Sequence, residues 1–163
     1  RHTRLRRDLS SDVCSSDLAL ERSPNHRGAI MCKALVFISQ KMYLEANEEL
    51  NYLINFLEKN LQDDDPTGIG TLAAAYANRG IIKDRQENYE EALEDYIKAI
   101  KIDEEAVGGP GFGTVILNYK FKSSSVKKRA IYIHEQLQLP KNERVLKINE
   151  LDEGQVMHKP GKL

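Results

Sequence analysis

Two groups of side chains look like parts of metal sites, and neither group is complete. His134 and Glu135 open an H-E-x-x-H zinc motif, but Gln138 stands where the second histidine is required. The acidic run Asp63 to Asp65 offers oxygen ligands suited to Ca²⁺, yet the bidentate glutamate of an EF-hand loop is not in place. We therefore expect a solvated helix face at His134, a helix-ending acidic turn at Asp63 to Asp65, and no bound metal.

Phosphate-binding and nucleophilic chemistry also lack the residues that they need. The segment Gly108 to Gly113 is not followed by the Gly-Lys-Ser/Thr of a phosphate-binding loop and follows no strand pattern, so we expect a flexible turn. Cys32 and the four histidines show no pairing of a nucleophile with a base, and we expect Cys32 to be a small core residue. The sequence predicts no catalytic residue and no cofactor, and we expect a protein that is not an enzyme.

Five cations between residues 120 and 129 are the strongest basic cluster. Only Tyr119 and Phe121 are interleaved with them, and no recognisable nucleic-acid module surrounds them. We favour a solvated helix end or a patch for an anionic partner, and nucleic acid is not the expected partner. The cluster comprises Lys120, Lys122, Lys127, Lys128 and Arg129.

Composition favours helix and a soluble chain. Lys plus Arg number 24 and Asp plus Glu 25, which gives a net charge of −1 and no global attraction for nucleic acid or anionic membrane. There is no Trp, and the chain is rich in Glu, Lys, Leu, Ala and Ile, which lose little freedom in a helix. No apolar run approaches the roughly 20 residues needed to span a bilayer. Since the cysteines do not form a disulfide framework, the cytoplasm is slightly favoured.

Residues 73–106 contain two helical patterns around a polar break, as a helical hairpin does. In the second pattern Ala92, Tyr96 and Ala99 recur on one face. Asn88 and Glu91 have the spacing of a capping box, which predicts the start of that helix. Gly80 interrupts the first pattern at a cost of about 1 kcal/mol relative to Ala, so we expect a close approach of the two helices there.

This unit resembles the tetratricopeptide repeat, whose signature is W-x₂-L-G-x₂-Y, then A-x₃-F, then P. The resemblance implies an all-α solenoid of helix-turn-helix units that binds a protein or peptide and has no catalytic activity. The residues that it implies for packing are Tyr76, Gly80, Tyr89, Ala92, Tyr96 and Ala99. The departures are Arg79 in the Leu slot, Lys83 in the Tyr slot and Glu104 in the Pro slot, and we expect them to weaken the junction to a following repeat.

The remaining segments are predicted around this unit. Residues 27–68 are expected to form a divergent hairpin with a long second helix and an acidic loop, and 19–26, with Pro24, a remnant of a preceding repeat. The two copies start at Arg27 and Ala73, further apart than the family's repeat of about 34 residues. Residues 107–140 are expected to form a Gly-rich turn and a capping helix from Val126, and 141–163 an extended tail.

Residues 1–18 lack a helical period. Within them, residues 10–18 (SSDVCSSDL) resemble a translated sequencing adapter. We therefore expect 1–18 to be non-native and the array to have lost at least one repeat upstream, with a native disordered arm as the alternative.

In the tetratricopeptide family, the first helices of successive repeats line a concave groove for a partner segment. The corresponding candidates here are Met31, Leu35, Ala74, Ala77, Asn78, Ile81 and Arg85. Asn78 stands where some members grip a terminal carboxylate, but Met31 and Leu35 replace the Lys and Asn that such a clamp needs, so an apolar or mixed ligand fits better. The alternatives are a structural end-piece whose groove is filled by its own tail, and an accessory region of an enzyme whose catalytic domain lies upstream.

Overall fold

The computed structural model describes residues 17–107 and 126–148. The predictions for Gly108 to Gly113, for Lys120 and Lys122, for most of residues 1–18 and for the tail from 149 onward lie outside the described residues. Within the described ranges the chain is helical and contains no strand. The predicted all-α class is confirmed.

The first hairpin consists of α2 (Arg27–Ser39) and α3 (Tyr43–Asn60), preceded by a helical turn at residues 17–22. His26 caps α2, because its Nδ1 accepts a hydrogen bond from the amide of Ala29 at 3.1 Å. The apolar face of α3 is buried, and α3 packs against both α2 and the next helix of the chain. This apolar face comprises Ala46, Leu50, Leu53, Ile54 and Leu57.

The second hairpin consists of α4 (Pro66–Arg85) and α5 (Tyr89–Ile102), followed by the short helix α6 (Glu104–Val107). Asp65 caps α4 by accepting a hydrogen bond from the amide of Gly68 at 2.7 Å. Pro66 occupies the first turn, where its missing N–H costs nothing. The acidic run therefore ends in a helix start, and α4 begins upstream of Ala73.

Both hairpins turn in the same way. Lys41 and Glu87 each adopt a left-handed backbone, with φ of 61° and 64°. After α2 the amide of Met42 donates to the carbonyl of Phe37 at 2.9 Å, and after α4 the amide of Asn88 donates to that of Lys83 at 2.9 Å. These are the long bonds of a Schellman motif, so the two turns have the same backbone structure.

The predicted capping box at the start of α5 is wrong. Asn88 is the N-cap residue by position, but its side chain makes no capping hydrogen bond. Its amide is already used by the Schellman turn, and Glu91 faces Lys83 at 3.7 Å. The carbonyl of Lys83 thus accepts from the amide of Asn88 in place of the side chain of Glu91.

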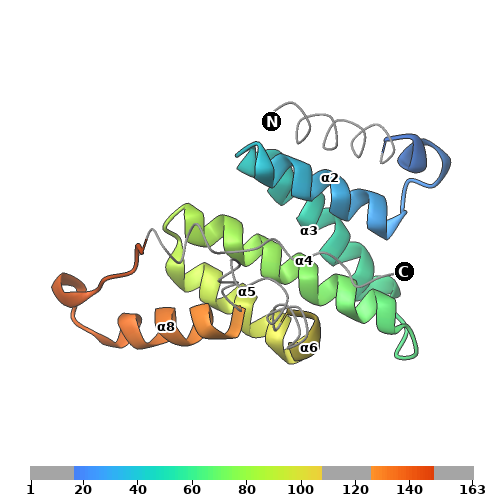
Figure 1. Cartoon of the computed structure of the whole chain (residues 1–163). Coiled ribbons are helices and arrows are strands. Elements are labelled where there is room, and N and C mark those ends of the chain that lie inside the picture. The colour runs from blue at the N-terminus through green and yellow to red at the C-terminus, as the bar shows by residue number, and fades with distance from the viewer. Residues whose placement is uncertain (1–16, 108–125, 149–163) are drawn as a thin grey trace, which may run out of the picture.

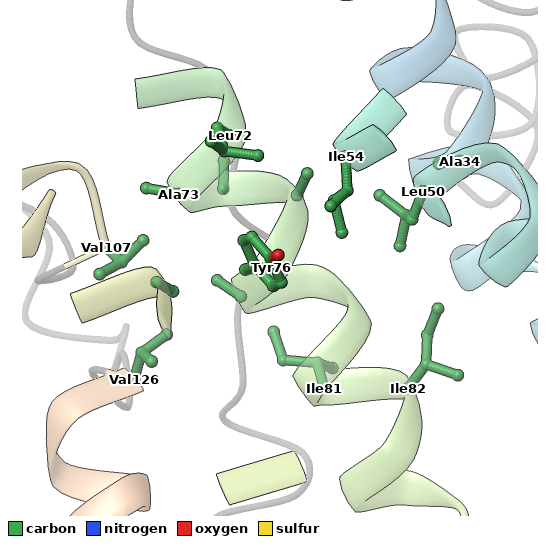
Figure 2. Packing of buried hydrophobic residues seen from close by; sticks show 14 of the residues in the cluster. Ala34, Leu50, Ile54, Leu72, Ala73, Tyr76, Ile81, Ile82, Val107 and Val126 are labelled. Atoms are coloured by element: carbon green, nitrogen blue, oxygen red, sulfur yellow. The ribbon is translucent and has the colours of Figure 1, made fainter. Parts of the chain in front are cut away.

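The hairpins stack in chain order (Figure 1). Helix α4 packs against α2, α3, α5 and α6, and α8 (Val126–Gln138) packs against α5. Figure 2 shows Tyr76, Ile81 and Ile82 of α4 in the core, with Leu50 and Ile54 on one side and Val107 and Val126 on the other. A single hydrophobic core therefore runs from the first hairpin to the capping helix.

Helix α8 is the last α-helix of the described residues. Ala130 and Ile133 are buried against the second hairpin, while Lys127, His134 and Glu135 are exposed. A 3₁₀ turn at Lys141–Glu143 follows, and residues 144–148 have no regular secondary structure. This arrangement is that of a tetratricopeptide-like solenoid with a C-terminal cap. No helix in the described part of the chain combines the length and the apolar character needed to cross a membrane.

Candidate partner-binding surface

The closest approach between α4 and α5 occurs at Gly80. A Cβ placed there would lie 2.7 Å from the Cδ1 and Cε1 atoms of Tyr96 and 3.3 Å from the carbonyl oxygen of Ala92. Tyr96 is fully buried, and its hydroxyl donates to Asp84 at 3.0 Å, so the ring is fixed. The position therefore has no room for a side chain.

Arg79 and Lys83, the departures in the Leu and Tyr slots, share one acceptor. Nε and Nη2 of Arg79 donate to Asp95 at 2.8 and 2.7 Å, and Nζ of Lys83 lies 2.9 Å from the same carboxylate. Asp95 is 1 % exposed and lies on the face of α5 that meets α4. The hydrogen bonds to Asp95 raise the pKa of Arg79 above its ordinary value. Both cations thus bind a carboxylate of their own hairpin and make no contact with a following repeat among the described residues.

Tyr76 joins the two hairpins through its hydroxyl group. The hydroxyl donates to the carboxylate of Glu58 on α3, and Arg79 and Lys98 lie over the ring, 5.1 and 5.2 Å from its centre. Burial, and next the hydrogen bond to Glu58, raises the pKa of Tyr76 to about 12. Arg79 also donates to Asn51 on α3 at 2.6 Å. Polar contacts therefore fix the spacing of α3 and α4.

The seven groove candidates lie on α2 and α4, and six of them are buried. Helix α4 is buried at every position from Thr71 to Asn78, which places its whole circumference out of contact with solvent. Arg85, in the last turn, is half-buried. The buried candidates are Met31, Leu35, Ala74, Ala77, Asn78 and Ile81. Their assignment to partner binding stays a prediction.

Asn78 and Met31 connect the first helices of the two hairpins. The side-chain amide of Asn78 donates to Sδ of Met31 at 3.5 Å, and both residues are 0 % exposed. Sulfur is a weak acceptor, so this hydrogen bond contributes little to the stability of the fold. It does define how α2 and α4 are aligned where they meet. Two predicted groove residues are thereby placed in direct contact.

The remaining chemical candidates are dispersed. Cys32 is exposed, so its prediction as a core residue is wrong: it lies on the outer side of α2, while Met31 and Ala34 face the core. Within residues 17–107 and 126–148, no three His, Cys, Asp or Glu side chains gather closely enough to hold a metal ion. His134, Asp63 and Asp64 are exposed.

One comparison with known proteins agrees with this geometry. Residues 73–105, which cover most of α4 and all of α5, match the family model of the tetratricopeptide repeat. The hairpin is a tetratricopeptide repeat. No curated protein and no solved structure matched the chain. The repeat and the helical fold indicate a protein–protein interaction scaffold, a class that is typically non-catalytic.

The residues that sequence reasoning missed are the buried charges of the tetratricopeptide repeat and its cap. Asp84 and Asp95 sit at helical positions in an amphipathic pattern that reads as solvated, and Arg129 was grouped with a surface cluster. One signal in the sequence could have revealed Asp95. Arg79 and Lys83 stand in slots that normally hold Leu and Tyr, and two cations at such packing positions imply a buried anion nearby. Periodicity alone cannot reveal it.

Proposed function

We propose that the chain is a non-catalytic scaffold that binds a peptide or partner segment along α2 and α4. The observation that supports this is the pairing of a tetratricopeptide repeat with a second helical hairpin stacked upstream of it, in contact through Met31 and Asn78. In such stacks the first helices of neighbouring hairpins form one continuous surface.

Arg85 is the residue of this surface with the clearest polar role. Its side chain is half-buried at the end of α4, and no carboxylate among the described residues pairs with it. A half-buried guanidinium gains most from an acceptor that replaces lost water. The ligand that fits is therefore an apolar segment carrying one carboxylate or carbonyl acceptor, rather than a charged tail.

The test is a fluorescence-anisotropy titration against an array of short extended peptides, apolar with a single acidic residue. We expect saturable binding that Arg85→Ala weakens about tenfold or more, as loss of one charge-assisted hydrogen bond does. Lys101→Ala is the matched control, since it removes an equal charge from the last turn of α5. Equal weakening by both variants, or no effect of Arg85→Ala, would contradict the assignment.

A second candidate function is a structural end-piece whose groove is occupied by its own chain. The unbroken burial from Thr71 to Asn78 supports it, because a groove-lining helix with a free face would leave some of these positions exposed. Truncation after Ile148 removes part of the proposed tail while sparing the described residues that contact α8. Under this candidate the truncated chain is less stable and binds peptides that the full chain does not. If neither property changes, this candidate is ruled out.

A further inference from the structure

The capping helix is held to the second hairpin through one guanidinium group. Arg129 is 2 % exposed, and its Nε and Nη2 donate to the two carboxylate oxygens of Asp84 at 2.8 and 2.7 Å. Asp84, on α4, is 3 % exposed and also accepts from Tyr96. A buried, bidentate pair of this kind fixes one register between two elements.

The same guanidinium holds the chain that follows α8. Nη2 of Arg129 donates to the carbonyl of Leu146 at 2.9 Å. Leu146 belongs to residues 139–148, which we call the strap, and its side chain packs against the core. Arg129 thus contacts the hairpin, through Asp84, and the strap, through Leu146, at the same time.

The strap and α8 are bound to each other by contacts internal to residues 126–148. Tyr132 donates to the carbonyl of Val145 at 2.6 Å, and the amide of Val145 donates to Gln136 at 2.7 Å. Arg144 donates to the carbonyls of Leu137 and Leu139, both at 2.9 Å, which satisfies the end of the helix. The strap therefore completes α8 rather than forming an independent tail.

Two further polar contacts join this unit to the second hairpin and α6 at the surface. Lys127 pairs with Glu104, and Lys147 pairs with Glu87, and all four side chains are more than half exposed. Exposed pairs of this kind contribute roughly 0–1 kcal/mol each. Among the described residues, the pair of Arg129 and Asp84 is a buried polar contact that must break, together with the apolar contacts of α8, for the unit to leave.

We propose that α8 and the strap open and close as one unit, with Arg129 as the latch that joins both to the hairpin. Opening exposes the end face of the tetratricopeptide repeat without unfolding α2 to α5. Local units of this kind open below the free energy of global unfolding. The inference does not depend on the proposed function, because it concerns the end of the stack and not the surface of α2 and α4.

Native-state hydrogen exchange of the full chain tests the proposal. In the wild type we expect amides of α8 and the amide of Val145 to exchange through one common opening, faster than the core amides of α4 and α5. Arg129→Ala should raise the opening constant of both by the same factor, on the order of 100-fold, because it leaves Asp84 buried without its cation. Lys127→Ala, which removes an exposed pair on the same helix, should change it less than about fivefold.

If circular dichroism shows that Arg129→Ala loses helix throughout the chain, the exchange experiment uses Arg129→Lys instead. An ammonium group cannot hold both oxygens of Asp84 and the carbonyl of Leu146 in the same geometry. We therefore expect Arg129→Lys to accelerate exchange less than Arg129→Ala, and by the same factor in α8 and at Val145. Different opening constants for α8 and the strap in the wild type would overturn the proposal. Acceleration of α8 with an unchanged Val145 amide in either variant would overturn it as well.

Discussion

Arg79 and Asp95 form a two-bond ion pair across the hairpin of α4 and α5, with donor–acceptor distances of 2.8 and 2.7 Å. The pair occupies a position that an apolar contact would fill in the family signature. Lys83 joins it at 2.9 Å. The repeat has thus exchanged part of its apolar seam for a charge cluster centred on one buried carboxylate.

Asp95→Ala is expected to destabilise the chain by about 2 kcal/mol in urea unfolding. This is below the roughly 3–5 kcal/mol for a fully buried pair, because the side chains of Arg79 and Lys83 are 17 % and 19 % exposed and can turn toward water. Glu94→Ala, at the exposed neighbouring position of α5, serves as the control and should stay within about 0.5 kcal/mol. A similar loss of stability in both variants would contradict the claim that the ion pair of Asp95 with Arg79 and Lys83 stabilises the hairpin.

Gly80→Ala is expected to destabilise the chain, although Ala is the better helix former. The added Cβ would meet the fixed ring of Tyr96 at 2.7 Å, and an overlap this close costs about 2–3 kcal/mol, more than the propensity gain of about 1 kcal/mol. Gly28→Ala on α2 should instead be neutral or stabilising, since its Cβ meets only the exposed ring of His26, at 3.3 Å. Thermal unfolding of both variants measures whether each melting temperature falls or rises. A stabilised Gly80→Ala chain would show that α4 and α5 do not touch at this position.

Lys41→Gly is expected to stabilise the chain by about 0.5–1 kcal/mol. Lys41 holds φ at 61°, where glycine has no steric cost, and this relief exceeds glycine's greater freedom in the unfolded chain. The same type of replacement in the exposed middle of α3, Glu48→Gly, should cost about 1 kcal/mol. Opposite signs in urea unfolding are the predicted result, whereas a destabilised Lys41→Gly chain would argue against the left-handed turn.

The Asp65 carboxylate should make stability depend on pH in the acid range. The hydrogen bond from the amide of Gly68, and then the contact with Arg27, lower its pKa below the ordinary value of 3.8. The unfolded state therefore binds a proton first as the pH falls. The stabilisation is present above pH 3.8 and is lost as the pH falls through the lower folded-state value.

Asp65→Asn keeps a capping side chain and removes this titration. Its unfolding free energy should vary less between pH 5 and pH 2 than that of the wild type. Asp63→Asn, at an exposed position of the same acidic run, should leave the wild-type profile unchanged. If the unfolding free energy of Asp65→Asn depends on acid pH as strongly as that of the wild type, the pKa of the Asp65 carboxyl group is not lowered by folding.

The elements with strong periodicity could be predicted from the sequence. Ala92, Tyr96 and Ala99 mark a buried face because their spacing matches one side of a helix, and Gly80 signals a close contact because no other property favours it mid-helix. The start of α4 at Pro66 was harder to predict, since a proline after an acidic run is equally compatible with the end of α3.

The buried polar contacts could not be predicted, because they depend on which residues meet in three dimensions. Arg129 stands beside two exposed lysines in the sequence, and only the docking of α8 places it opposite Asp84. The capping box failed for a related reason. The backbone of the Schellman turn at Glu87 already satisfies the amide of Asn88, which leaves the side chain of Glu91 without that role.

The central claim is that α2 and α4 lie side by side as the first helices of successive hairpins. An NMR measurement of nuclear Overhauser effects between the methyl group of Met31 and the side-chain amide of Asn78 tests it most directly, because the sulfur and nitrogen atoms are 3.5 Å apart. We predict a cross-peak between these groups. Assigned resonances for both groups without such a cross-peak would contradict the stacked arrangement and the shared binding surface that depends on it.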